Sequence, residues 1–397
     1  MKLPSTAFLA FALLLLLNLN VCRVESARPQ GLGTGHHAPG EGHHPPGEGH
    51  HHDHDHDGDG GHNGGHKHDH KHHHHDEEYD GYSFYVFGDS FADNGNLPSK
   101  NDQWPELTRQ WHEPYSANGR FSNNQMVQSD FIANMLGQSE SPPAHMVTSH
   151  VGQTGMNFAA GGAGVFEVQQ GVTTLGEQVH AFHKLVKAKK IKKEHLEGNS
   201  VALVAISGND YARVGVRTSG FFDITAFVDK VTTEIQTVVA RLQEIGVDKV
   251  IVNNLFPVGC APSQTRPNNH TTCEEQGNQG ASLHNKYLGD KLADKEGVLV
   301  LDISAAFTEI IGHHGDGRGE LAHKFGHKLT PCCESVDPKG YCGQRAYDEY
   351  NEIYSTYSVC DEPNGYFFWD DMNPTQAGWA AVMGQLESPI KEFLDLD

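Results

Sequence analysis

Short apolar runs rich in β-forming residues alternate with amphipathic stretches of helical length from residue 81 onward. The runs lie at Phe84–Phe87, Met156–Ala159, Val201–Ile206, Lys249–Asn254 and Val298–Leu301. The amphipathic stretches include Val127–Leu136, Phe227–Leu242, Leu283–Leu292 and Gln376–Phe393. Apolar side chains recur in these stretches every three to four residues, as one face of a helix requires. The alternation predicts βαβ units, and hence an α/β fold with a mainly parallel sheet between two layers of helices.

Residues 1–26 have the pattern of a signal peptide. Lys2 precedes an apolar run from Ala7 to Leu17, and Val24 and Ser26 place small residues just before a cleavage site. The apolar run is too short for a comfortable membrane span, so an uncleaved anchor is the weaker alternative. We therefore expect an exported protein with no stable membrane anchor.

The cysteines agree with export. One cysteine, Cys22, lies in the signal segment, and the remaining six are Cys260, Cys273, Cys332, Cys333, Cys342 and Cys360. An even number in an exported chain favours disulfides, whereas zinc at these thiols would call for paired CxxC motifs, which do not occur. We expect a Cys260–Cys273 bridge, with the other four cysteines pairing within the long excursion Gly312–Cys360. Asn269 begins a glycosylation sequon between Cys260 and Cys273.

Residues 27–80 form a separate zone that is rich in His, Gly and Asp. Seventeen of the 29 histidines lie here, with eleven acidic residues and three basic ones. The zone has almost no apolar surface to bury, so we expect a disordered arm. It is either a solubilising spacer or a metal-binding tract, because imidazole suits zinc, copper or nickel. The candidate metal ligands are His50, His51, His52, His54, His56, His72, His73, His74 and His75.

The net charge of the chain is −22 with neutral histidines, which makes a nucleic-acid partner a poor expectation, because phosphate contacts need a basic surface. Free histidine titrates near pH 6.5, so the arm becomes positive in acid. Acidic polysaccharide at low pH is therefore a candidate partner of the arm.

Four segments at or beyond the ends of the predicted strands carry polar residues that suit acyl transfer. Ser90 follows the first strand, Gly161 and Gly162 follow the second, and Asn209 follows the third. Asp370 and Asn373 precede the last helix. Serine is a nucleophile, and glycine N–H groups and an asparagine amide can donate hydrogen bonds to an oxyanion. Each residue alone is more typical of a helix cap or a turn; the set is what points to chemistry.

These segments resemble blocks of the plant GDSL esterases/lipases in the SGNH hydrolase superfamily. FGDSFADNGN, NFAAGG and SGND are similar to the first three blocks of that family. The resemblance implies a three-layer α/β/α sandwich with a flavodoxin-like, five-stranded parallel sheet. It implies hydrolysis of carboxylic esters of lipids, cell-wall polymers or small molecules, without a cofactor and in the cell wall or apoplast. It also implies that Ser90 is the nucleophile and that the oxyanion hole consists of Ser90, Gly162 (or Gly161) and Asn209.

The last block departs from the family. The resemblance implies an Asp, two variable residues and a His, but here Asp370 is followed by Asn373. An amide is not basic near neutral pH, so Asn373 cannot take the serine proton. Three hypotheses follow: slow hydrolysis with a water held by Asp370, catalysis with a histidine from the excursion, or a catalytically silent binding protein. The excursion offers His313, His314, His323 and His327.

Overall fold

The computed structural model describes residues 81–96, 125–148, 150–166, 168, 171–211, 223–312, 315–317, 319–337, 340–350 and 352–396. The predicted signal peptide, the His-rich arm with its candidate metal ligands, and the pair His313 and His314 lie outside these residues.

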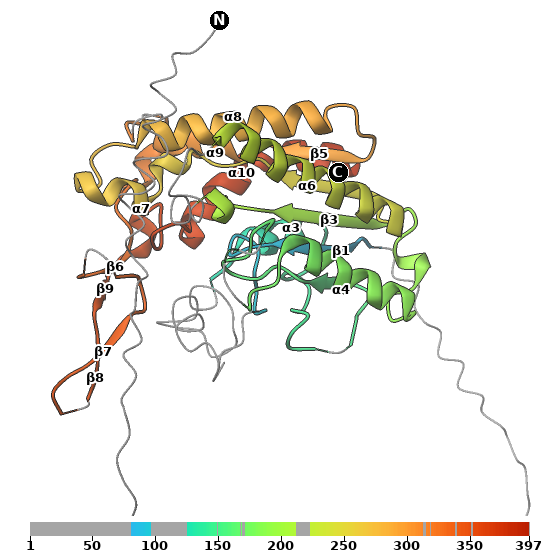
Figure 1. The fold of residues 1–397 in the computed structure, drawn as a ribbon, viewed down its shortest axis with the longest axis horizontal. Helices are drawn as coiled ribbons and strands as arrows, with labels where there is room; N and C mark the ends of the chain where they lie inside the picture. The colour runs from blue at the N-terminus through green and yellow to red at the C-terminus, as the bar shows by residue number, and fades with distance from the viewer. Residues whose placement is uncertain are drawn as a thin grey trace, which may run out of the picture. The chain divides into compact units, whose positions relative to one another are not determined.

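Five parallel strands form the central sheet in the order β2-β1-β3-β4-β5 (Figure 1). The strands are β1 (Ser83–Gly88), β2 (Gly155–Asn157), β3 (Ser200–Ala205), β4 (Lys249–Asn253) and β5 (Val298–Leu301). Each begins within a residue of an expected run. In register, Phe84 of β1 is opposite Gly155 of β2 and Val201 of β3. The strand order is that of the flavodoxin-like doubly wound sheet, so the predicted fold class is confirmed.

Alternate residues of the strands face two different helix layers. Phe84 and Val86 pack into one core cluster, and Tyr85 and Phe87 pack into the other. The first cluster includes side chains of α3 (Gln128–Met135), α9 (Ile303–Ile311) and α10 (Gln376–Leu394), and the second includes those of α4 (Leu175–Lys187), α6 (Ile224–Ile245) and α8 (Glu275–Leu292). A sheet buried on both faces is the expected outcome of parallel βαβ units.

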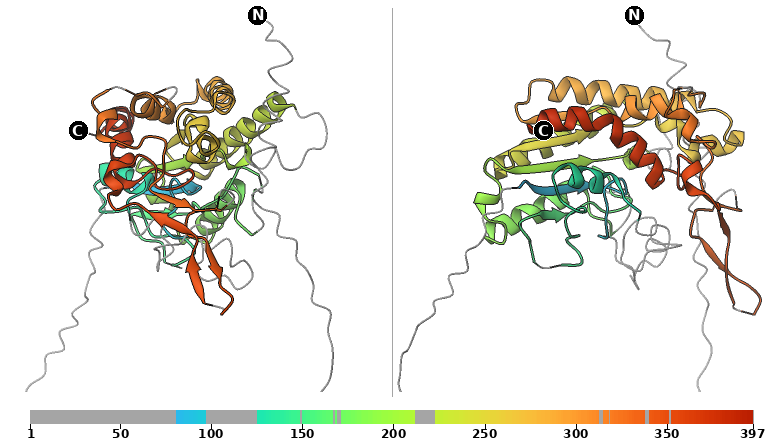
Figure 2. Two further views of the ribbon diagram at one scale, coloured as in Figure 1. Left: turned by 90° about the vertical axis from the view of Figure 1, so that its left-hand side faces the viewer. Right: turned by 180° about the vertical axis from the view of Figure 1, so that it is seen from behind.

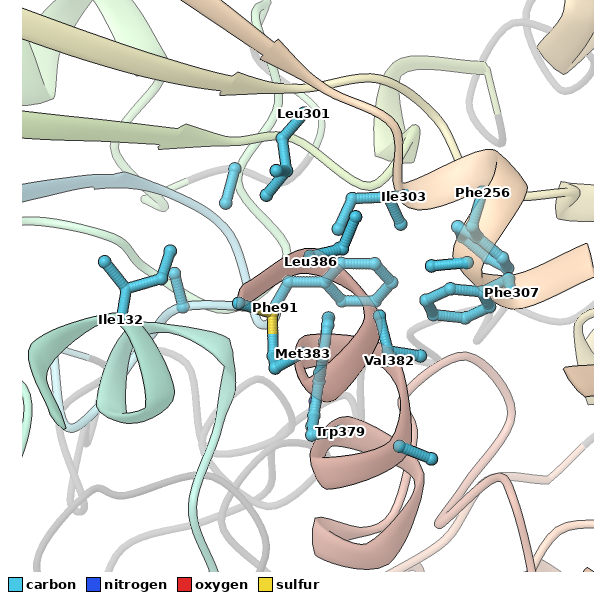
Figure 3. Packing of buried hydrophobic residues seen from close by; sticks show 14 of the residues in the cluster. Phe91, Ile132, Phe256, Leu301, Ile303, Phe307, Trp379, Val382, Met383 and Leu386 are labelled. Carbon is cyan, nitrogen blue, oxygen red and sulfur yellow. The ribbon is translucent and has the colours of Figure 1, made fainter. Parts of the chain in front are cut away.

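The larger aromatic side chains of the first cluster lie behind the first strand-end loop. Phe91 packs edge-on against Trp379 of α10, with ring centroids 5.0 Å apart (Figure 3). Phe307 of α9 contacts both Phe91 and Phe256. The residue that follows Ser90 is therefore anchored in a fully buried core, which holds the Ser90 turn in place.

The excursion Gly312–Cys360 contains two small antiparallel sheets. One pairs β6 (Cys333–Ser335) with β9 (Tyr357–Val359), and the other pairs β7 (Arg345–Tyr347) with β8 (Ile353–Ser355). In both views of Figure 2 these strands lie outside the three layers. The disulfides are Cys260–Cys273, Cys332–Cys360 and Cys333–Cys342, which confirms the expected pairing.

The sequon residue Asn269 is exposed in a turn of the loop closed by Cys260–Cys273. Among the helices that the structure describes, none is long and apolar enough to cross a membrane. The same part of the chain holds no group of three or more His, Cys, Asp or Glu side chains arranged for a metal ion.

Candidate active site

Three neighbouring strands bring their carboxyl-end loops to one edge of the sheet. β1 lies between β2 and β3, so Ser90, Gly162 and Asn209 lie in adjacent loops at that edge. Ser90 as a residue is 2% exposed. The structure therefore brings together the residues that the sequence placed at separate strand ends.

The backbone N–H groups of Ser90 and Gly162 are among those in these loops that have no acceptor within the described residues. The neighbouring Gly161 N–H instead donates to Asp93 Oδ2 at 2.7 Å. Gly162 has a φ of 74°, a left-handed conformation that glycine adopts without strain. Free N–H groups are what an oxyanion hole needs. Of the two glycines considered from the sequence, Gly162 is the one whose amide is available.

Asp89 links the first and third loops. Its Oδ2 accepts hydrogen bonds from the Ser207 N–H at 2.6 Å and from the Ser207 hydroxyl at 2.7 Å. Its Oδ1 accepts one from the Phe91 N–H at 3.1 Å. Burial raises the pKa of Asp89 to about 7, although these hydrogen bonds favour the charged form. Asp89 thus holds the Ser90 turn against the end of β3.

Asn209 has both amide hydrogens engaged. Its Nδ2 donates to Asp89 Oδ2 at 3.1 Å and to the Ala163 carbonyl at 2.9 Å. The second contact connects the β3 loop to the glycine loop after β2. To stabilise an oxyanion, Asn209 would have to share or redirect one of these hydrogens, so its predicted role as an oxyanion donor stays a prediction.

The fourth segment holds Asp370 and Asn373 just before α10. Asn373 Nδ2 donates to both Asp370 carboxylate oxygens, at 3.0 Å and 3.2 Å. The Asn373 backbone N–H donates to Asp370 Oδ1 at 2.8 Å. Burial raises the pKa of Asp370, and the hydrogen bonds from Asn373 and the Met372 backbone act in the opposite direction. The Asn373 amide therefore faces the acid as the N–H of an imidazole would.

The other atom of that amide is without a partner. Asn373 is 1% exposed, and its Oδ1 accepts no hydrogen bond within the described residues. A buried polar atom of this kind is costly to leave unsatisfied, and such atoms call for an explanation. Asn373 can accept a hydrogen bond at this oxygen, but it cannot remove a proton.

The family comparison matches these segments. A family model described as GDSL-like Lipase/Acylhydrolase covers residues 84–385.

The chain belongs to the GDSL esterase/lipase family.

One GDSL esterase/lipase of Arabidopsis thaliana is 32% identical over 319 residues, which is 77% of this chain and 88% of the relative. A second one from the same plant is 31% identical over 326 residues, or 78% of this chain and 87% of the relative. A solved structure of a catalytic mutant of an acetylxylan esterase from Geobacillus stearothermophilus is 10% identical, with a TM-score of 0.35. It covers 80% of this chain and 95% of that chain, and a score this low supports no inference. Family membership makes this GDSL protein a carboxylic ester hydrolase by relationship.

Two of the four excursion histidines lie within the described residues of this GDSL esterase/lipase. His323 is exposed, and His327 is exposed and stacks on Tyr366 with ring centroids 4.1 Å apart. No histidine in the described part of the chain hydrogen-bonds Ser90 or Asp370. His284 is buried and bonded to the Tyr211 hydroxyl, and burial lowers its pKa to about 3.

The Asp370 segment is tied to the disulfide-held excursion. The Cys332 N–H donates to the Phe368 carbonyl, and the Cys333 N–H donates to the Trp369 carbonyl. The Trp369 N–H in turn donates to the Asn373 carbonyl at 2.7 Å. The excursion therefore serves as a brace for the acid-bearing segment of this GDSL esterase/lipase.

Proposed function

We propose that the protein is a secreted serine ester hydrolase in which Ser90 attacks carboxylic esters slowly, because Asn373 stands where the family resemblance implies a histidine. The substrates are esters of lipids, acylated cell-wall polymers or small molecules. The observation that carries the proposal is the Asn373 amide, which donates to both oxygens of Asp370 and leaves its own Oδ1 unpartnered.

In this geometry the Asn373 amide can orient a hydroxyl group, but it cannot transfer a proton. With Nδ2 held by Asp370, the Asn373 Oδ1 is the acceptor that remains for a hydroxyl group. This oxygen can orient Ser90 or a water molecule by accepting a hydrogen bond. It is far too weakly basic to remove the proton of the serine hydroxyl. The free N–H groups of Ser90 and Gly162 still stabilise a tetrahedral intermediate. An oxyanion hole with a defective triad typically retains about 10³–10⁴-fold over the reaction in water.

The reaction then follows the usual two steps of acyl transfer. Ser90 Oγ adds to the ester carbonyl, the alcohol leaves with a proton supplied through water, and a second water hydrolyses the acyl-enzyme. Each proton passes through solvent in place of an imidazole. Slow turnover is therefore the expected result.

A catalytically silent binding protein is the second candidate, and the same amide favours it. If Asn373 immobilises Asp370 without activating Ser90, the oxyanion loops become a binding site for acylated ligands. Hydrolysis of short-chain p-nitrophenyl esters distinguishes the two functions. We expect slow release of p-nitrophenol by the wild type that Ser90→Ala abolishes; turnover that Ser90→Ala leaves unchanged would support the binder.

If a histidine from the excursion acted as the base, replacing that histidine would abolish the activity. His323→Ala and His327→Ala should leave the slow turnover unchanged, because both side chains are exposed and neither contacts Asp370 or Ser90. Loss of activity in either of these variants, or in His313→Ala or His314→Ala, would overturn the proposed absence of a histidine base.

Export to the cell wall or apoplast is supported by the apolar N-terminal run and by three disulfides, which form in oxidising compartments. The arm is proposed to bind divalent metal ions and, in acid, polyanions such as pectin. The positive charge gained when its 17 histidines are protonated would exceed the net negative charge from its excess of acidic residues. Pectin binding that does not strengthen between about pH 7.5 and about pH 5 would contradict this role.

A further inference from the structure

A pocket of about 310 Å³ lies at the β2 edge of the sheet, where the Met146 N–H donates to Asn96 Oδ1 at 2.9 Å. It is formed by the loop before β2, by β2 itself and by the C-terminal end of α4 with the turn that follows. In a parallel sheet the crossover helix runs back toward the amino ends of the strands, so the end of α4 lies far along the helix from the catalytic edge. None of the lining residues belongs to the Ser90, Gly162, Asn209 or Asp370 loops.

The walls of this pocket are largely apolar. Met156 of β2 is 1% exposed, and Leu185 of α4 lies on another wall. Met146 and Val147 also line the pocket and are 63% and 66% exposed. Covering two such adjacent apolar side chains would be favourable by about 25 cal/mol per Å² of apolar surface removed from water. A ligand with a hydrocarbon chain would cover them.

Two polar side chains of the pocket, Lys190 and His145, can donate hydrogen bonds to a ligand; Thr148, which also lines it, bonds to the His150 backbone. Lys190 is the charged group of the lining. The His145 ring packs on Phe158 with centroids 4.9 Å apart, and its buried Nδ1 has no partner in the described part of the chain. A buried N–H without an acceptor is costly, so the ring proton belongs on Nε2. Burial and nearby Lys190 lower the pKa of His145, which keeps the ring neutral.

The surface beside the pocket is basic in an otherwise acidic protein. Six lysines lie within residues 184–193, and all of them are exposed. Within the described residues, Lys192 alone among the six forms an ion pair, with Glu194 at 3.3 Å. The chain as a whole has a net charge of −22. A local concentration of unpaired cations attracts an anionic ligand to this end of the molecule.

We propose that the pocket binds the anion of a medium-chain carboxylic acid, with the carboxylate at Lys190 and His145 Nε2 and the chain against Met156 and Leu185. Charge-assisted hydrogen bonds from an ammonium and an imidazole N–H suit a carboxylate. The volume is at the lower end of the range of about 300–1,000 Å³ found for small-molecule sites, which suits a ligand of about eight to ten carbons. The site is separate from the ester-hydrolysing site and does not depend on the function proposed for it.

Calorimetric titration with decanoate tests the proposal, using the full chain with Ser90→Ala so that no turnover contributes. We expect one site per chain. Lys190→Gln should weaken binding by about tenfold, the usual effect of one charge-assisted contact. Leu185→Trp, which fills the pocket, should abolish binding. The matched control Lys193→Gln removes an exposed lysine that does not line the pocket and should change the affinity less than twofold.

Decanol provides the ligand control, because it has the same chain without the charge; it should bind at least tenfold more weakly than decanoate. If Leu185→Trp does not fold, Met146→Glu places a negative charge on the exposed rim and should weaken decanoate binding instead. Equal affinity for decanol and decanoate, or decanoate binding that Lys190→Gln and Met146→Glu leave unchanged, would overturn the proposal. Binding to anionic vesicles that Lys193→Gln and Lys190→Gln weaken equally, without saturable decanoate binding, would assign the lysines to a membrane surface and also overturn it.

Discussion

Around Ser90 the backbone is arranged for ester chemistry, whereas around Asp370 the side chains are arranged mainly to satisfy one another. The N–H groups of Ser90 and Gly162 are left without acceptors among the described residues. The Asp370 carboxylate, in contrast, receives the Asn373 side chain at both oxygens and the Asn373 backbone at one. In the proposed mechanism the charge-stabilising half of the site is therefore complete, whereas the proton-transfer half has a hydrogen bond to Asp370 but no base.

The comparison shows that the hydrogen bond to Asp370 and the ability to accept a proton are separate properties of the side chain at position 373. We infer that Asn373 makes the contact with Asp370 that the family resemblance implies for a histidine. Asn373 does not provide the basic second nitrogen of an imidazole ring, which would take the proton from Ser90. Variants that change one half at a time should therefore have distinct effects.

The largest expected effect comes from restoring the base. Asn373→His should raise kcat/KM for short acyl esters by about 10²–10⁴, the typical contribution of general-base catalysis. The Asp370 carboxylate is already placed to accept the imidazole Nδ1–H. Steady-state kinetics measure the gain, and Ser90→Ala in the same background is the control that should remove it. An unchanged rate in folded Asn373→His would show that the charge-stabilising half is not competent.

The next effect comes from the oxyanion side. In the Asn373→His background, Gly162→Ala should lower kcat by about 10²–10³, the usual cost of losing one oxyanion donor. A side chain at a φ of 74° strains the backbone and moves the N–H group. Gly161→Ala is the matched control, because the Gly161 N–H is bound to Asp93. A larger loss for Gly161→Ala would assign the donor to Gly161 instead.

Removing the brace of the proton-transfer half should cost stability. The double substitution Cys332→Ser, Cys360→Ser opens a bridge between residues 28 apart. Chain entropy predicts a loss of about 3–4 kcal/mol in the free energy of unfolding, which urea titration measures. The same change in the Asn373→His background should also reduce the gain in kcat, since Cys332 is hydrogen-bonded to Phe368. Full stability after removal of the bridge would contradict the role of the excursion as a brace.

The smallest effect is that of pH on stability. Burial raises the pKa values of Asp89 and Asp371 to about 7 and also raises that of Asp370, so the folded protein keeps protons that the unfolded chain releases near pH 4. Buried His284, whose pKa is lowered to about 3, acts in the opposite direction below about pH 6.5, but the acids outnumber it. The free energy of unfolding should therefore fall as the pH rises from about 4 to about 7, with a slope of at most about 1.4 kcal/mol per pH unit for one proton. Urea unfolding at pH 5, 6 and 7 measures the slope. Repeating it in about 0.5 M salt screens the net charge of the chain. A free energy of unfolding that rises over this window would be the contrary result.

Much of the fold was predictable because its signal is local. The five strands are short and flanked by turns, and all but the half-buried edge strand β5 are mostly buried; α6, α8 and α10 have apolar residues at three-to-four spacing. Helices α4 and α9 were not predicted, although their sequences carry the signal. The buried residues of α9 are Ile303, Ala306, Phe307, Ile310 and Ile311, which recur every three to four positions as one helix face requires.

The residues of the candidate site could be predicted from the sequence, but the hydrogen bonds between them could not. Ser90, Gly162 and Asn209 follow strands, and adjacent parallel strands bring such residues to one edge. The roles of Asp89 and Asp93 were missed, because they depend on partners far away in the chain: Asp89 binds Ser207, which is 118 residues on, and Asp93 binds Gly161. The only available signal was the position of Asp89 directly after a buried strand. The engagement of both Asn209 hydrogens likewise follows from tertiary packing.

The rate at which a fluorophosphonate probe labels Ser90 tests the central claim most directly, because that reaction requires an activated serine and reports no later step. Mass spectrometry should locate the label at Ser90. We predict slow labelling of the wild type and labelling of Asn373→His that is faster by about 10²–10⁴ and that declines below the pKa of an imidazole, near 6.5. Rapid labelling of wild-type Ser90, at the rate found for Asn373→His, would contradict the account.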